Sequence, residues 1–157
     1  MDRIQIFVAG ASQGSAEDIA NGELVGRLLA ERGAAVITGG LGGVMEAVSR
    51  GAKSAGGMTV GILPTLRIED ANPYVDLRIA SGVGHARNLI NVASAQCVIA
   101  IGGGWGTLSE IALARKVGVP VVALGSWPGL SDEIAVAGSP EEAVERAMKL
   151  ARDESYG

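Results

Sequence analysis

The sequence predicts an α/β fold: one domain over residues 1–157, built on a doubly wound parallel sheet of about seven strands with helices on both faces. Short apolar runs rich in β-branched residues alternate with helical stretches along the chain. Strands that are apolar along their full length are typical of parallel sheets whose two faces are covered by helices. With 157 residues, 48% of them hydrophobic, the chain can bury such a core without disulfides or metal ions.

The apolar runs and the stretches between them give the order of elements. Strands are expected over residues 4–10, 34–40, 58–64, 74–80, 97–103, 119–125 and 133–138. Helices are expected over residues 16–32, 43–55, 85–95, 107–117 and 140–153. The last helix has the clearest start, because Ser139 can cap it, Pro140 suits its first position and Glu142 completes a capping box. The polar segment 66–76 is expected to be a loop, and the whole order is Rossmann-like.

Composition excludes several kinds of partner. The net charge is −4 and only 3% of the residues are aromatic, which disfavours nucleic acid. No apolar run approaches the ~18 residues of a membrane span, and the first residues do not resemble a signal sequence, so we expect a cytoplasmic protein without membrane partners. One cysteine and one histidine cannot form a Cys/His metal cluster, and Cys97 lies in an apolar run that predicts a buried thiol.

Glycines gather at the ends of the predicted strands. The sequences GASQGS, TGGLGGVME and GGGWGTLSE follow the first, second and fifth strands, and SGVGHARN follows the fourth. Because ligands of open α/β sheets bind at the carboxyl ends of the strands, these loops should form one site. Backbone N–H groups at a glycine turn and at a helix start suit phosphate. We therefore expect phosphate to bind at Gly103, Gly104, Trp105, Gly106 and Thr107.

Four common chemistries fit the sequence poorly. Residues 10–14 read G-x-S-x-G, but His85 precedes the phosphate-type loop instead of ending the fold as in a serine hydrolase. Ser12 is better explained as a hydroxyl donor to a ligand or as a plain turn residue. The first loop lacks the G-x-G-x-x-G spacing, and no G-x-x-x-x-G-K-[ST] occurs, which disfavours NAD, FAD and P-loop ATP hydrolysis. The lysines lie in or near predicted helices, not at strand ends, which disfavours pyridoxal chemistry.

Arg87 and Glu110 each have two interpretations. Arg87 lies in the first turn of a predicted helix, where a cation opposes the helix dipole unless an anion offsets it, so it can bind an anion. Alternatively it is a surface arginine or pairs with Glu110 or Asp76. Glu110 can form a capping box with Thr107, or it can serve an active site. The residues alone leave both pairs of alternatives open.

The motifs resemble those of the Lonely Guy family, nucleoside 5′-monophosphate phosphoribohydrolases whose bacterial relatives were once labelled lysine decarboxylases. The family pattern G-G-x-x-G-[LV]-M matches Gly39, Gly40, Gly43, Val44 and Met45. The pattern P-G-G-x-G-T-x-x-E matches from Gly102, which replaces the proline, to Glu110. The pattern H-x-R-K matches His85 and Arg87, with Asn88 in place of the lysine. The chain looks closest to a short bacterial and archaeal subgroup that also resembles molybdenum-cofactor carrier proteins.

The resemblance implies a reaction and a site. Arg87 and Glu110 correspond to the catalytic pair, which hydrolyses an N-glycosidic bond to give free base and ribose 5-phosphate without a metal or other cofactor. A non-catalytic role is the alternative: a carrier or sensor of a phosphate-bearing nucleotide or molybdenum cofactor. The family implies a homodimer, which we place at the apolar helix 85–95. Further ligand contacts are expected at Gly10, Ser12, Gly39, Gly40, Gly43, Met45 and His85.

Overall fold

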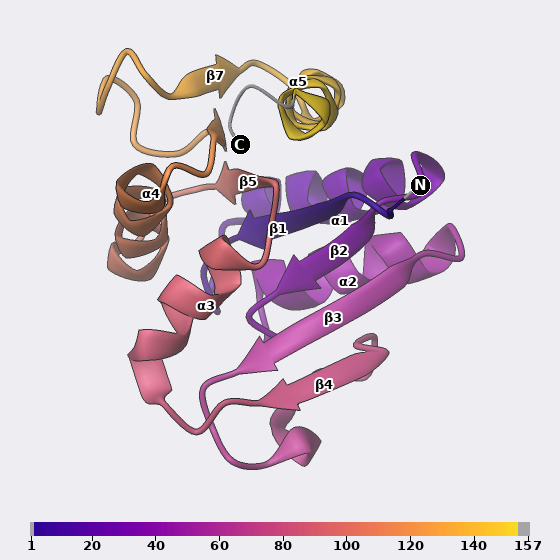
Figure 1. Ribbon diagram of the computed structural model, residues 1–157. Coiled ribbons are helices and arrows are strands. Elements are labelled where there is room, and N and C mark those ends of the chain that lie inside the picture. Colours follow the sequence, from indigo (N-terminus) through magenta and orange to yellow (C-terminus); the bar gives the residue numbers. More distant parts are fainter. Residues whose placement is uncertain (1, 154–157) are drawn as a thin grey trace.

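The computed structural model describes residues 2–153 as a parallel sheet flanked by helices (Figure 1). The strands are β1 (Gln5–Ala9), β2 (Ala35–Thr38), β3 (Met58–Leu63), β4 (Leu77–Ala80), β5 (Cys97–Ile101), β6 (Val121–Leu124) and β7 (Ala135–Ala137). The helices are α1 (Ala16–Glu31), α2 (Val44–Ser54), α3 (Arg87–Ala93), α4 (Trp105–Val117) and α5 (Pro140–Arg152). Two short 3-10 helices, η1 (Ile68–Asp70) and η2 (Gly84–Ala86), complete the described elements.

The strand order creates a switch point at the centre of the sheet. Within residues 2–153 the order is β4-β3-β2-β1-β5-β6-β7, and neighbouring strands pair in parallel. The chain leaves β1 toward β2 and leaves β5 toward β6, so the connections diverge between two strands that pair directly, with Phe7 opposite Val98. A crevice forms at such a divergence in open α/β sheets. The predicted doubly wound, Rossmann-like α/β fold is confirmed.

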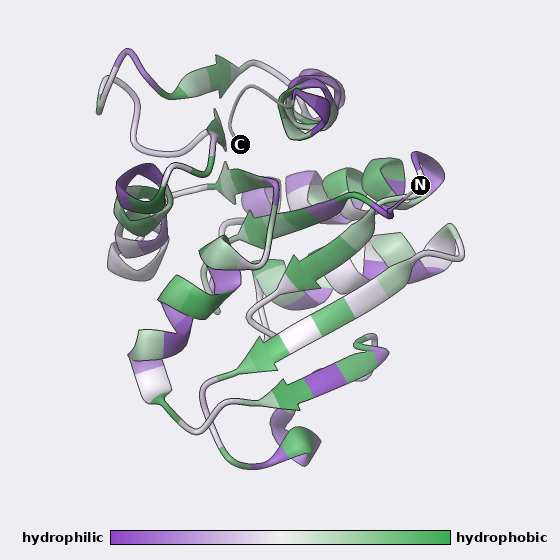
Figure 2. Cartoon of the chain, in the orientation of Figure 1, coloured by the Kyte–Doolittle hydropathy of each residue, from purple (hydrophilic) through white to green (hydrophobic). Residues whose placement is uncertain are grey.

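Each face of the sheet has its own core. Successive side chains of a strand point to opposite faces, so Ile6 and Val8 of β1 pack under α1, α2 and α5, whereas Phe7 and Ala9 pack under α3 and α4. Figure 1 shows these two sets of helices on opposite sides of the sheet. In Figure 2 the central strands are mostly hydrophobic, whereas the edge strand β4 carries a hydrophilic residue between hydrophobic ones. The central strands are therefore covered on both faces, as their sequence predicts.

Strand boundaries differ from the sequence prediction at several places, and most at the start of β4, which begins at Leu77 instead of residue 74. Strand β2 stops at Thr38 and β5 stops at Ile101, two residues earlier than expected. The glycines that follow enter the left-handed backbone region, with φ of 77° at Gly40 and 68° at Gly102, and leave the sheet. The loops that start there are consequently longer than predicted and form the walls of the candidate site.

Helices α1 and α5 start where the sequence predicts, whereas α2 starts one residue late and α3 and α4 start differently. The stretch 85–95 divides into η2 and α3, and α4 begins at Trp105 instead of residue 107. The capping box of α5 is confirmed in outline: the Ser139 hydroxyl accepts from the Glu142 N–H at 3.2 Å. The Glu142 carboxylate accepts from the Gly138 N–H at 2.8 Å, one residue before the expected donor.

Two further predictions concern single segments. Residues 66–76 form the expected loop, with η1 inside it, and Asp76 at its end pairs with Lys53 of α2 at 2.9 Å. Cys97 is fully buried in β5, and burial raises the pKa of its thiol to about 12. None of the helices within residues 2–153 is long and apolar enough to cross a membrane.

Candidate functional site

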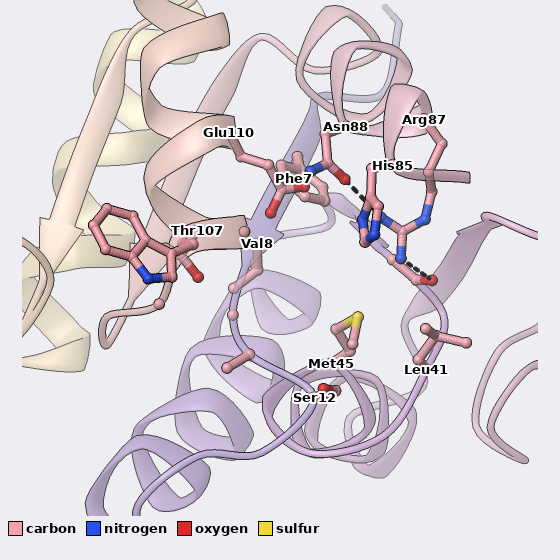
Figure 3. A pocket seen from close by; sticks show the side chains of 16 residues that line it. Phe7, Val8, Ser12, Leu41, Met45, His85, Arg87, Asn88, Thr107 and Glu110 are labelled. Atoms are coloured by element: carbon pink, nitrogen blue, oxygen red, sulfur yellow. Dashed lines mark hydrogen bonds between the residues drawn. The ribbon is translucent and has the colours of Figure 1, made fainter. Parts of the chain in front are cut away.

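A pocket of about 290 Å³ opens at the switch point between β1 and β5. The loop after β1, the loop after β2, the η2–α3 segment and the start of α4 each contribute to its walls. In Figure 3 the side chains of Asn88 and Glu110 lie across the pocket from those of Ser12, Leu41 and Met45. Its lining residues are Phe7, Val8, Gly10, Ala11, Ser12, Gly39, Leu41, Met45, His85, Arg87, Asn88, Gly104, Trp105, Gly106, Thr107 and Glu110.

The turn between β5 and α4 presents an uncapped helix start to the pocket. Gly104 is the N-cap residue of α4, its backbone is extended, and no side chain accepts a hydrogen bond from the first turn. The first N–H groups of a helix have no partner within the helix. They also carry the positive end of the helix dipole. This wall of the pocket therefore suits an anion with several acceptor oxygens.

Arg87 is the first residue of α3, and its guanidinium is buried at the pocket. Its Nη1 donates to Asn88 Oδ1 at 2.7 Å, and its Nη2 reaches the Gly39 carbonyl at 3.4 Å. The buried Nε has no hydrogen-bond partner among the described residues. Burial lowers the pKa of Arg87 from its ordinary value, while the nearby charge of Glu110 raises it. A buried cation with an unused donor is stabilised by an anion in the pocket.

Gly39 makes room for this arginine. A Cβ atom on Gly39 would lie 2.7 Å from Met45 Sδ and 2.9 Å from Arg87 Nη2. Both distances are too short for non-bonded atoms, so a larger residue would displace the guanidinium or the thioether. The glycine at the end of β2 is therefore needed for the position of Arg87.

Glu110 is buried on the first turns of α4 and bonds to the neighbouring helix. Its Oε2 accepts from Asn91 Nδ2 of α3 at 3.0 Å. Burial raises the pKa of Glu110 to about 7, and the Asn91 hydrogen bond and the charge of Arg87 oppose this rise. A carboxyl group with a pKa near neutrality can both donate and accept a proton at physiological pH.

The structural alternatives that the sequence left open for these residues are wrong. Helix α4 begins at Trp105, so Thr107 lies inside the first turn and cannot be the N-cap of a box with Glu110. Arg87 is not a surface residue, with 8% of its area exposed, and among the described residues it forms no ion pair with Glu110 or Asp76. Both side chains thus remain available to a molecule in the pocket.

Asn88 connects Arg87 to the glycine turn. Its Oδ1 accepts from Arg87, and its Nδ2 donates to Ser109 Oγ of α4 at 3.0 Å. Ser109 Oγ in turn donates to the Gly106 carbonyl at 2.7 Å. This chain of hydrogen bonds runs from the guanidinium to the turn. Asn88 stands where the Lonely Guy pattern has lysine, and an ammonium group could not accept the Arg87 bond.

The structure brings most of the predicted site residues together, but not all. Gly40, Gly43 and Gly103 do not line the pocket. Gly40 packs against Leu63, and Gly43 packs against the backbone of Ser12, where the two loops meet. Gly103 lines an adjacent groove. The sequence-based prediction missed Phe7, Val8, Ala11, Leu41 and Asn88, which line the pocket.

Comparison with known families assigns the chain to a family. Residues 3–154 match the model of the SLOG cluster4 family. The chain belongs to this family. The resemblance to Lonely Guy relatives and to molybdenum-cofactor carriers is thereby confirmed. A protein of Archaeoglobus fulgidus that carries no functional description is 47% identical over 144 residues, 92% of this chain and 94% of the relative.

Solved structures of two carrier-type proteins are similar along nearly the whole chain. The molybdenum cofactor binding protein of Rippkaea orientalis is 40% identical, with a TM-score of 0.91 over 96% of this chain and 98% of that one. The molybdenum cofactor carrier protein of Chlamydomonas reinhardtii is 32% identical, with a TM-score of 0.87 over 95% of this chain and 98% of that one. Sheet and helices are therefore shared along the full length of these proteins.

Proposed function

We propose that the chain binds a phosphate-bearing, nucleotide-like small molecule in the pocket at the switch point. The observation that carries this proposal is the buried Arg87 Nε, a cationic donor without a partner among the described residues, beside an uncapped helix start. Both groups are donors, and both are stabilised by an anion. The expected phosphate contacts at Gly104, Gly106 and Thr107 lie on the same wall.

Carriage of a molybdenum cofactor is the first candidate function. The solved structures named for this cofactor are similar to the chain at 40% and 32% identity over almost its whole length. Cys97 is buried in the sheet, and burial raises the pKa of its thiol to about 12, so the metal atom of the cargo would not be held by this cysteine. The phosphate of the cofactor would instead be held by Arg87 and the glycine turn.

Hydrolysis of an N-glycosidic bond is the second candidate, and Glu110 favours it. Breaking such a bond creates positive charge on the ribose, which a nearby carboxylate stabilises, and a carboxyl group of pKa near 7 can activate water. Arg87 would bind the phosphate of a nucleoside 5′-monophosphate. The products would be free base and ribose 5-phosphate.

One set of assays separates the two candidates. The purified protein is incubated with AMP, GMP, CMP, UMP or IMP, or with molybdenum cofactor released from a molybdoenzyme. Binding is measured by equilibrium dialysis and free base by chromatography. A carrier retains the cofactor, protects its ability to activate a cofactor-free molybdoenzyme, and releases no base.

The Glu110→Gln variant gives the decisive outcome. Base release by the wild type that disappears in Glu110→Gln would establish hydrolysis and contradict pure carriage. The matched control is Glu133→Gln. The Glu133 carboxylate pairs with Arg115 at the surface, so this change should alter neither ligand binding nor base release. Absence of binding to every ligand would overturn the proposed function altogether.

A cytoplasmic location, a homodimer and the absence of nucleic-acid partners remain predictions. The homodimer prediction gains support from the exposed apolar side chains of α3, Leu89 and Ile90. Leu77 and Ile79 of β4 pair with Val60 and Ile62 of β3, whose side chains belong to the core under α3 and α4. Leu77 and Ile79 therefore lie on the face of the sheet that α3 and α4 cover. Together these side chains form an apolar surface over α3 and β4.

A further inference from the structure

Both tryptophans of the chain border a second groove, directly beside the pocket. This groove has a volume of about 480 Å³ and is lined by Gly103, Gly104, Trp105, Gly125, Trp127 and Pro128. None of these residues carries a charge. The groove is therefore defined by two indoles, one proline ring and glycine backbone, in contrast to the pocket, where Arg87 and Glu110 are buried.

Trp105 offers an open indole surface at this groove. It is the first residue of α4, and 81% of its area is exposed. Burying the rings of a large aromatic side chain is favourable, so an indole this exposed offers area to a ligand. Its ring centroid lies 5.7 Å from that of Trp127, with 42° between the ring planes. The two indoles thus form an aromatic wall with a free face.

Trp127 is held in this place at a cost in backbone conformation. Its φ is 39°, and among the described residues it is the one non-glycine residue with a positive φ. Residues with side chains rarely adopt this region, and such positions are concentrated at functional sites. Its Nε1 is buried without a hydrogen-bond partner among the described residues, close to Gly103. A strained backbone and an unused N–H donor both remain unexplained by packing alone.

The groove and the pocket meet at the glycine turn. Gly104 and Trp105 line both of them, so the turn divides one continuous surface into an apolar side and a charged side. A phosphate at this turn would have room for an attached group in each direction. Planar rings stack on indoles irrespective of their hydrogen-bonding pattern.

We propose that the groove binds an uncharged planar ring of the same ligand whose phosphate lies on the glycine turn. The ligand class is then one in which two ring systems are joined through phosphate, as in a dinucleotide. This inference rests on the proposed function, because it requires the phosphate to bind at the turn. It adds that a mononucleotide fills the pocket and leaves the aromatic groove open.

The test compares AMP with diadenosine 5′,5′-diphosphate, in which a second adenosine is joined through phosphate. Affinities are measured by equilibrium dialysis, and tryptophan fluorescence reports on the groove because both tryptophans border it. We expect the dinucleotide to bind at least about tenfold more tightly than AMP and to quench the fluorescence more strongly. Trp127→Leu should remove this gain and leave AMP affinity unchanged, whereas Trp127→Phe should keep most of it.

The matched control is Leu130→Ala, which removes an exposed apolar side chain from the same segment outside the groove. Circular dichroism confirms that each variant is folded. Equal affinities for AMP and the dinucleotide would overturn the inference, and so would a gain in dinucleotide affinity that survives in Trp127→Leu. In either case, binding of AMP would still support the proposed function. Fluorescence that depends on protein concentration without ligand would assign the groove to a second copy and would also overturn it. If neither the nucleotides nor the molybdenum cofactor bound, both this inference and the proposed function would be overturned.

Discussion

Arg87 and Glu110 are buried at one pocket, yet among the described residues they do not form an ion pair. Each is instead bonded to an asparagine of α3: Arg87 to Asn88, and Glu110 to Asn91. Because these partners are uncharged amides, they hold both side chains in position without neutralising either charge. The pocket therefore contains a buried cation and, beside it, a carboxyl group whose pKa is raised to about 7.

Replacement of Arg87 should weaken anion binding. A hydrogen bond to a charged group contributes about 1.5–3 kcal/mol, so Arg87→Ala should lower the affinity for AMP by roughly ten- to a hundredfold. Arg87→Lys should restore only part of this affinity, because an ammonium group cannot bind bidentately. Isothermal titration measures the affinities. Arg115→Ala, which removes the surface pair with Glu133, serves as the control, and an equal loss in that variant would contradict the assignment.

Glu110 should make stability depend on pH. Its pKa is about 7 in the folded chain and near 4.5 when exposed. Between these values the folded state binds more protons at Glu110, so the contribution of this group to stability is greatest below pH 4.5 and falls as the pH rises toward and past 7. Glu110→Gln should therefore gain about 2–3 kcal/mol relative to the wild type between pH 5 and pH 8. Urea unfolding at both pH values measures this, and a constant difference between the two proteins would contradict it.

At the scale of elements, α3 and α4 are linked by side chains across the pocket. Asn88 and Ser109 connect Arg87 to the turn before α4, and Asn91 holds Glu110. These bonds join residues 19 and 21 positions apart, so only the packing of the two helices creates them. The site depends on this helix pair as a unit.

Asn88 should act on ligand binding through Arg87. Asn88→Ala removes the acceptor that holds Nη1 at 2.7 Å, and we expect AMP affinity to fall by about threefold to tenfold. In the Arg87→Ala background the same change should have almost no effect, because the residue that it positions is gone. A double-mutant cycle by calorimetry measures the coupling. Independent effects of the two changes would show that Asn88 does not act through Arg87.

The helices α1 and α2 approach closely on the opposite face. A Cβ atom on Gly51 of α2 would overlap the backbone carbonyl of Glu23 in α1. Glycine to alanine normally stabilises a helix by about 0.5–1 kcal/mol, so Gly51→Ala should instead destabilise the protein by about 1–3 kcal/mol. Chemical denaturation measures this change. Arg27→Ala on the exposed side of α1 should change stability by less than about 0.5 kcal/mol, and a stabilised Gly51→Ala variant would contradict the contact.

At the scale of the whole molecule, one face of the sheet is incompletely covered. Helix α3 has seven residues, and it leaves β4 at the sheet edge with Leu77 and Ile79 about half exposed. The apolar surface over α3 and β4 adjoins the segment that carries His85 and Arg87. A second copy on this surface would bury it and would lie close to the pocket.

A charge on this surface should separate the copies. Leu89→Glu, at a position 44% exposed, should convert a dimer to a monomer, because an unpaired carboxylate is costly in an apolar interface. Light scattering after size exclusion measures the mass. Leu130→Glu, at a similarly exposed position on the segment between β6 and β7, is the control and should leave the dimer intact. A wild-type monomer at high concentration would contradict the homodimer prediction.

The sequence by itself determined the fold class, the order of elements and the strand ends at which the site lies. These features follow from local causes: apolar periodicity, turn glycines and the parallel connections that bring the carboxyl ends of strands to one edge. Eleven of the fourteen predicted site residues line the pocket, and Gly43 lies where two of its loops meet, because motifs of glycines report loop geometry directly.

Only the tertiary structure decided the chemistry of individual side chains. The spacing of Thr107 and Glu110 fits a capping box, but the helix begins at Trp105 and the carboxyl group bonds to Asn91 of another helix. Likewise Asn88, Phe7 and Leu41 enter the pocket through packing that no local pattern encodes. Burial, which raises the pKa of Glu110 and leaves Arg87 Nε without a partner, arises when α3 and α4 close over the sheet. Long-range packing therefore decides which charges meet, whereas short-range sequence decides where the loops begin.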